Sequence, residues 1–166
     1  MHLFLNHNDL NALPEGLFDK LGLLKSLALQ RNRLTNITTE AFRGLKHLIA
    51  LDLSANNISH PIRSGTFVHS KGLAYVSLAF NEQVQSIEPG AFGKSLEHIW
   101  LTGCSNLTCA ALERTDGALP RQASCTDKGS CDGVYGVASI GTGLCDEKFD
   151  PVYNTAECLW DGGECD

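Results

Sequence analysis

Cysteine is the residue type with the clearest chemistry in this chain, and its distribution is uneven. Seven cysteines occur among 166 residues, and all of them lie at or after position 104. Cysteines this dense in a short segment are typical of disulfide-bonded proteins from an oxidising compartment. A segment of this size has little core, so bridges would stabilise it by restricting the unfolded chain. The sequence therefore predicts an oxidised tail that begins near residue 104.

Motifs for enzymatic chemistry do not occur in the sequence. The histidines are scattered, and no two of them form an H-E-x-x-H pair. Residues 136–141 contain a serine between glycines, but their spacing does not fit a G-x-S-x-G nucleophile elbow. A phosphate-binding G-x-x-x-x-G-K-[ST] loop is also missing. We therefore expect a protein that is not an enzyme and has no catalytic residues.

Charge divides the chain at the same place as cysteine. Residues 1–103 contain nine basic and eight acidic side chains, whereas residues 104–166 contain four basic and eleven acidic ones. The nearly neutral first part lacks the basic footprint that nucleic acid requires. No apolar run approaches the ~20 residues of a membrane-spanning helix. We expect no nucleic-acid partner and no membrane contact within this chain.

Three N-x-S/T sequons agree with the cysteines in pointing to secretion. Their asparagines are Asn36, Asn57 and Asn106, which we predict as glycosylation sites. The N-terminus lacks the charged, apolar and small-residue regions of a signal peptide, and Met1 enters directly at a repeat. We interpret the chain as a fragment or truncated gene model of a secreted protein, or of the ectodomain of a larger membrane protein, with its secretion signal upstream.

A repeat of 24 to 25 residues, with a last interval of 23, defines the elements that carry these side chains. Asparagine recurs in one frame of leucines, and the fifth position is taken by cysteine: Asn8, Asn32, Asn56, Asn81 and Cys104. Two apolar columns keep the same period: Leu13, Ile37, Ile62 and Ile87, then Phe18, Phe42, Phe67 and Phe92. One such unit cannot bury its apolar side chains alone, so neighbouring units must stack and share a core. The sequence predicts a solenoid whose short L-x-L segments form a parallel sheet.

Residues 3–107 fit the pattern LxxLxLxxNxL and resemble the leucine-rich-repeat family. The resemblance implies an α/β repeat solenoid, a horseshoe with short parallel strands on its concave face, over residues 1–107. Families of this kind commonly place cysteine at the ladder position. We expect Cys104 to be buried there as a weak S–H donor.

Outward positions of the concave sheet are the predicted site of protein recognition. Aromatic side chains beside polar ones suit protein contacts, because a ring buries a large area with few rotatable bonds. The candidate binding residues are Trp100, Phe80, His98, Arg31, Asp52 and Gln30. For Trp100, packing against a following cap is an equally good interpretation.

Residues 108–130 are predicted to cap the end of the array. Thr108 is a candidate N-cap for the helical run 109–113, and Gly117 stands where such a helix would stop. A bridge between Cys109 and Cys125 would close the open end of the solenoid.

Residues 131–166 resemble the Notch-repeat module, a small cysteine-rich calcium-binding unit. The resemblance rests on the run 158–165, C-L-W-D-G-G-E-C, with Asn154 four residues before it. It implies a disulfide-rich irregular module with bridges Cys131–Cys158 and Cys145–Cys165. The family's second and fourth cysteines have no counterpart here, and Tyr153 stands at the fourth place, so one bridge is missing. The seventh cysteine is the ladder residue Cys104.

Calcium is the cofactor that the Notch resemblance implies. Its ligands would be the side chains of Asp161 and Glu164 and the backbone carbonyl of Asp146. Two further positions, usually Asp or Asn in the family, hold Thr142 and Ser139. Fewer anionic ligands mean weaker binding. The alternative is a degenerate site in which the two bridges alone hold the module.

Together these features predict an extracellular module that binds a protein ligand of unknown identity. The alternative is a substrate-docking fragment of a larger secreted enzyme, such as a metalloprotease or a sugar-phosphate transferase, because Notch-like modules also occur beside such domains.

Overall fold

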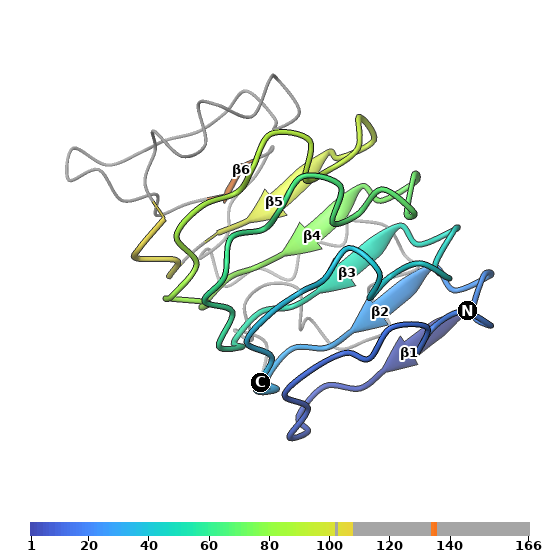
Figure 1. Cartoon of the computed structure of the whole chain (residues 1–166), viewed down its shortest axis with the longest axis horizontal. Helices are drawn as coiled ribbons and strands as arrows, with labels where there is room; N and C mark the ends of the chain where they lie inside the picture. Colours follow the sequence, from blue (N-terminus) through green and yellow to red (C-terminus); the bar gives the residue numbers. More distant parts are fainter. Residues whose placement is uncertain (102, 108–133, 136–166) are drawn as a thin grey trace, which may run out of the picture.

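The computed structural model describes residues 1–101, 103–107 and 134–135 (Figure 1). Five three-residue strands recur at the repeat interval: β1 (His2–Phe4), β2 (Ser26–Ala28), β3 (Ala50–Asp52), β4 (Tyr75–Ser77) and β5 (His98–Trp100). Each pairs in parallel with the next, so that the order of strands in the sheet is their order in the sequence. The predicted parallel-strand solenoid is confirmed.

The strand register aligns equivalent residues of successive repeats. The middle residues of the strands lie opposite one another in the series Leu3, Leu27, Leu51, Val76 and Ile99. Because successive strand residues point to opposite faces, this column points into the solenoid. Its last four members are completely buried, whereas Leu3 in the first repeat is only partly buried.

The two other apolar columns also stack inside the solenoid. Ile62 and Ile87 form an isolated parallel bridge on the strand-distal side. The phenylalanine rings stack in order along the array, with centroid separations of 6.5 Å between Phe18 and Phe42, 5.4 Å between Phe42 and Phe67, and 4.9 Å between Phe67 and Phe92. Each repeat therefore places one ring on the ring of its neighbour.

The α component of the predicted fold is wrong for the described residues, none of which forms a helix. The returning segments are successive turns, in which N–H groups donate three residues back, as from Leu21 to Phe18 and from Leu24 to Leu21, both at 2.9 Å. Each segment must leave one strand and reach the next within a single repeat. The first of these segments contains Pro14 and Gly22, which disfavour a helix. Helix nucleation is also unfavourable over so short a stretch.

A sixth strand, β6 (Val134–Tyr135), pairs antiparallel with β5, an arrangement that the sequence analysis did not anticipate. Its register sets Tyr135 opposite Ile99 and Val134 opposite Trp100. The hydrogen-bonding edge of the last repeat is therefore paired. The predicted cap at residues 108–130, and the Notch-like module apart from β6, lie outside the described residues.

Candidate functional site

The ladder asparagines fasten each repeat to the one before it. Asn56 Nδ2 donates to the carbonyl of Leu53 in its own repeat at 3.0 Å and to that of Leu29 in the preceding repeat at 3.1 Å. Its Oδ1 accepts from the Leu34 N–H at 3.0 Å. Asn32 and Asn81 repeat this pattern. All three are buried, whereas Asn8 is exposed.

Cys104 takes the fifth rung, as predicted, and its thiol donates to the Leu78 carbonyl at 3.2 Å. A thiol can donate a hydrogen bond, as the asparagine Nδ2 does, but it is a much weaker acceptor than the asparagine Oδ1. An acceptor is not needed here, because Val84 N–H donates to the backbone carbonyl of Asn81 at 3.1 Å. The one extra residue between Asn81 and Val84 permits this local turn, which explains why cysteine suffices at this rung.

The residue before each ladder residue has a left-handed backbone. This left-handed row consists of His7 (φ 56°), Arg31 (φ 55°), Ala55 (φ 50°), Phe80 (φ 57°) and Gly103 (φ 72°). Positive φ is uncommon outside glycine, and a bulky side chain there is an outlier. This row was not predicted from the sequence. The glycine at its fifth position was the available signal, because glycine adopts this conformation without strain.

Phe80 is the conspicuous member of the left-handed row. Its side chain is 47% exposed although it is large and aromatic. The ring lies over Gly103, since a Cβ added to that glycine would come within 2.8 Å of Phe80 Cδ1. Gly103 thus leaves the space in which the ring rests. Large aromatic side chains are usually buried, and residues other than glycine usually have negative φ. A residue that departs from both preferences is typical of a functional position.

The other predicted binding residues differ in accessibility. Arg31 is exposed and His98 is half-buried, whereas Gln30, Asp52 and Trp100 are buried. Ser54 N–H donates to Asp52 Oδ1 at 2.8 Å. Burial raises the pKa of the Asp52 carboxyl to about 6, against the hydrogen bonds from Ser54, which lower it.

An aromatic cluster on β4 and β5 accounts for Trp100. The Tyr75 and His98 rings stack at 5.2 Å, and the His98 and Trp100 rings at 6.0 Å. The Tyr75 hydroxyl donates to Glu97 Oε2 at 3.0 Å. Burial lowers the pKa of His98, and the charge of Glu97 opposes that shift. Tyr75 was missed from the sequence, although it occupies an outward position of its strand.

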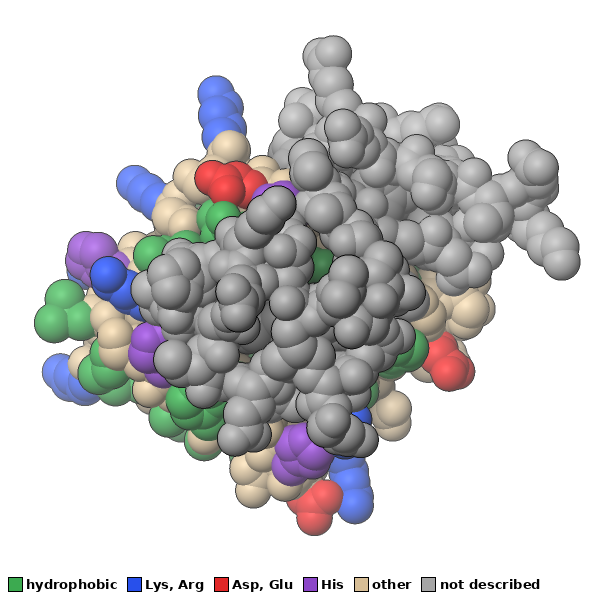
Figure 2. Space-filling model, turned by 180° about the vertical axis from the view of Figure 1, so that it is seen from behind, with side chains coloured by type: hydrophobic (Ala, Val, Ile, Leu, Met, Phe, Trp, Pro, Cys, Tyr) green, Lys and Arg blue, Asp and Glu red, His purple; other side chains and the backbone are tan. Residues whose placement is uncertain are grey.

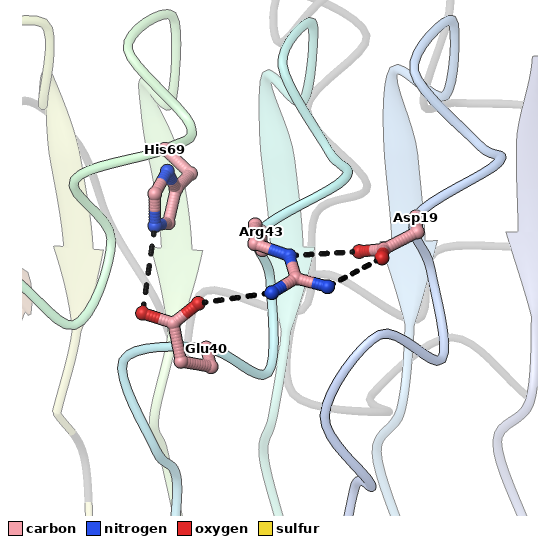
Figure 3. Close-up of polar contacts among 4 residues, drawn as sticks. All are labelled: Asp19, Glu40, Arg43 and His69. Carbon is pink, nitrogen blue, oxygen red and sulfur yellow. Dashed lines mark hydrogen bonds and ion pairs between the residues drawn. The ribbon is translucent and has the colours of Figure 1, made fainter.

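A chain of ionic contacts crosses three repeats along the segments that return from one strand to the next (Figure 3). The Arg43 guanidinium binds both carboxylate oxygens of Asp19, at 3.2 and 2.5 Å. Glu40 lies 3.7 Å from Arg43 and 3.9 Å from His69. The hydrogen bond from Arg43 lowers the pKa of Asp19, and the hydrogen bond to Asp19 raises the pKa of Arg43. Asp19 and Arg43 are exposed, and Glu40 and His69 are half-buried, so solvent screens these contacts and their contribution is small. We assign them to the joining of repeats.

The remaining predicted sites fall into two groups. Asn36, Asn57 and Asn106 are exposed. The predicted calcium ligands Asp146, Asp161, Glu164 and Thr142, and the six cysteines 109, 125, 131, 145, 158 and 165, lie outside the described residues. Among the described residues no group of three or more His, Cys, Asp or Glu side chains is placed to hold a metal ion. That same part of the chain has no helix long and apolar enough to cross a membrane.

The repeats are similar to those of known proteins. Residues 22–82 match the family model for the leucine rich repeat. Rat leucine-rich repeat-containing G-protein coupled receptor 5 is 33% identical over 132 residues, which cover 79% of this chain and 12% of that protein. Human Toll-like receptor 5 is 32% identical over 146 residues, covering 88% and 15%. Mouse podocan is 31% identical over 143 residues, covering 72% and 23%.

A solved structure supports the same fold. The glycosylated Toll–Spatzle complex of Drosophila contains a chain with 30% sequence identity and a TM-score of 0.52, covering 57% of this chain and 13% of that one. The chain spans less than a quarter of the length of the curated relatives described above. Two of those relatives are named as receptors and none as an enzyme, in agreement with the prediction that this chain is not an enzyme.

Proposed function

We propose that this leucine-rich-repeat solenoid is an extracellular protein-recognition module, as part of a secreted protein or of a receptor ectodomain. The names of the relatives support this proposal, since two are receptors, and the Toll structure is a complex with the protein Spatzle. A stack of repeats offers an extended surface with one variable position per repeat, which suits a protein partner.

Phe80 is the observation that carries the proposal. A half-exposed ring that is fixed against Gly103 buries area on contact without losing much rotational freedom, which is the property of interface hot spots. The left-handed backbone holds the ring in this position, with about half of the residue still exposed. A contact with a partner gives this arrangement a use.

Arg31 extends the surface along the same left-handed row. Two repeats separate it from Phe80, and the residue between them in the row is the small Ala55. Neighbouring strands lie ~4.8 Å apart, so the two positions are roughly 10 Å apart. An exposed cation and an exposed ring on either side of a small alanine offer charged and aromatic contacts to one segment of a protein partner. Trp100, buried in its own cluster, is better explained by packing.

Substitutions in matched pairs test this function. We would screen the secreted chain against a yeast-displayed library of extracellular domains, then measure dissociation constants for Phe80→Ala and Arg31→Ala. Their controls are Val68→Ala and Arg63→Ala, because both residues are exposed on the other side of the repeats. Removal of a hot-spot ring costs ~2 kcal/mol or more, a loss of about thirtyfold. Binders that lose equal affinity with Val68→Ala would contradict the assignment of this edge.

We further propose that residues 131–166 form a calcium-assisted Notch-like module beside the repeats. Support comes from the sequence run 158–165 and from the paired acidic side chains Asp161 and Glu164. Calorimetric titration of the full chain with calcium tests the proposal, with weak binding expected at ~10⁻³ M and lost in Asp161→Ala. Binding that survives this change would place the ligands elsewhere, and no binding would favour a module held by its bridges alone.

A further inference from the structure

The three sequon asparagines lie on one flank of the solenoid. Each follows a ladder residue closely: Asn36 follows Asn32, Asn57 follows Asn56, and Asn106 follows Cys104. Backbone bonds align these segments in space, since Asn57 N–H donates to Leu34 O at 3.0 Å and Asn106 N–H donates to Glu82 O at 3.3 Å. The segments that lead into the strands, on the other flank, contain no sequon.

The sequon side chains face solvent although the residues beside them are core. Asn36, Asn57 and Asn106 are exposed, whereas the next residue in each case, Ile37, Ile58 or Leu107, is at most 4% exposed. The adjacent pair Asn56 and Asn57 shows the contrast, since the first is buried in the ladder. Within the described part of the chain, no hydrogen bond uses the side-chain amide of a sequon asparagine. These amides are open to modification.

Repeat four interrupts the row of sequons. Residues 82–85 there read Glu-Gln-Val-Gln and contain no acceptor asparagine. The same repeat carries Phe80, at the start of the turn that leads into this segment. The acceptors flank this position, because Asn57 belongs to the repeat before it and Asn106 to the repeat after it.

We propose that Asn36, Asn57 and Asn106 carry N-linked glycans, and that these glycans cover one flank at repeats two, three and five, leaving repeat four between them as a window through which a protein reaches Phe80. The proposal rests on the extracellular function proposed above. Repeat four would lack a sequon for a reason, because a bulky, hydrated glycan at that position would keep a partner away from the Phe80 ring.

Glycan occupancy is the first test and requires no ligand. The full chain, secreted from eukaryotic cells behind a heterologous leader, would be deglycosylated enzymatically in heavy-oxygen water, which labels each formerly occupied asparagine. Mass spectrometry is expected to show label at Asn36, Asn57 and Asn106. Each of Asn36→Gln, Asn57→Gln and Asn106→Gln is expected to remove one glycan. An unlabelled site in the secreted, folded chain would overturn the proposal.

The window is tested with nanobodies selected against the deglycosylated chain. Those that lose binding in Phe80→Ala but not in Val68→Ala report access to the ring. They are expected to bind the glycosylated chain within about twofold of the deglycosylated one. The pair Gln83→Asn and Gln85→Thr adds a sequon with the same arrangement as the native ones, because residues 83 and 85 are exposed and Val84 is buried.

The added glycan at repeat four is expected to weaken these nanobodies at least about tenfold, and enzymatic deglycosylation of the same variant to restore them. The matched control is Gly93→Asn, which creates a sequon with Ser95 on the other side of the repeat, where nothing lies within 4 Å of an added Cβ. If the native glycans already prevent these nanobodies from binding, the proposal that repeat four is an open window is wrong. Because these readouts need no natural partner, they are independent of whether the recognition function holds.

Discussion

At the scale of single residues, the ladder shows how one side-chain type joins two repeats. Each buried asparagine donates to carbonyls of two repeats and accepts an N–H from the earlier one. These backbone groups lie where the chain leaves the sheet and would otherwise be buried without partners, at a cost of ~1–3 kcal/mol each. The asparagine side chain is thus part of the backbone hydrogen-bonding scheme.

We expect Asn56→Ala to lower the free energy of unfolding by about 3 kcal/mol, because it leaves the buried Leu34 N–H without its acceptor. It also removes one of the two donors from each of the Leu29 and Leu53 carbonyls, which keep their bonds from Asn32 and Asn81. Urea denaturation followed by circular dichroism measures this loss. Asn8→Ala is the control, since Asn8 is exposed and bonds only within its own repeat. Its cost should stay below ~1 kcal/mol, and equal costs would show that the interrepeat bonds add nothing.

Gly44 is required for a steric reason, not for its backbone angle. An added Cβ would collide with backbone atoms of Phe18 and Asp19 in the preceding repeat, which cannot move aside as a side-chain end can. We expect Gly44→Ala to destabilise the chain by at least about 2 kcal/mol in thermal or urea unfolding. Gly93→Ala should be neutral or slightly stabilising, because nothing lies within 4 Å of its added carbon. Similar effects at both positions would refute the close approach.

At the scale of elements, three-residue strands cannot be stable alone, and their stability comes from stacking. A strand of this length forms few hydrogen bonds, so the register of β1 to β5 depends on the columns beneath them. The phenylalanine stack is the most regular of these columns. It runs through four repeats and shares its apolar contacts between them.

We expect Phe67→Ala to cost ~3–5 kcal/mol, since the ring is 1% exposed and lies between Phe42 and Phe92. Loss of this ring should also reduce amide hydrogen-exchange protection in β2 and β4, because Phe42 and Phe92 of those two repeats lose their contact with it. The neighbouring Val68 is 56% exposed, and Val68→Ala should change stability by no more than ~0.5 kcal/mol. If protection is lost only in the repeat that carries the substitution, the stack does not couple neighbours.

At the scale of the whole molecule, the two ends of the array differ. β5 is paired with β6, whereas β1 has a hydrogen-bonded neighbour on one side only among the described strands. Leu3, Leu5, Leu10 and Leu21 are only partly buried. Hydrophobic side chains lie among basic ones and histidines at the left edge of Figure 2, the side on which β1 lies. An open strand edge beside exposed apolar surface favours association.

We expect the 166-residue chain to self-associate through its first repeat. Leu17 and Leu23 are 49% and 74% exposed, so replacing both with lysine should shift sedimentation toward the monomer. Val68→Lys is the control, because it adds charge at an exposed apolar residue of repeat three. A wild-type monomer whose hydrogen-exchange protection in residues 3–13 equals that in residues 48–58 would contradict this expectation.

The periodic features were determined by the sequence, because a residue type that recurs at a fixed interval indicates the same environment in successive units, here in all units after the first. The asparagine rungs, the two apolar columns, the parallel strands and the place of Cys104 all follow from spacing alone. Residue type also singled out Phe80 and Arg31 as candidates for binding, although it ranked the buried Trp100 beside them.

Contacts between units were decided only by the tertiary structure, since they depend on distances that no single repeat contains. The collision that requires glycine at position 44, the ring of Phe80 over Gly103 and the bidentate pair of Arg43 with Asp19 each join residues about one repeat apart. The left-handed row could not be predicted from the sequence, because its five residues share a backbone angle but differ in side-chain type. The pairing of β6 with β5 joins segments from opposite sides of the boundary at residue 104, where the repeat pattern no longer applies.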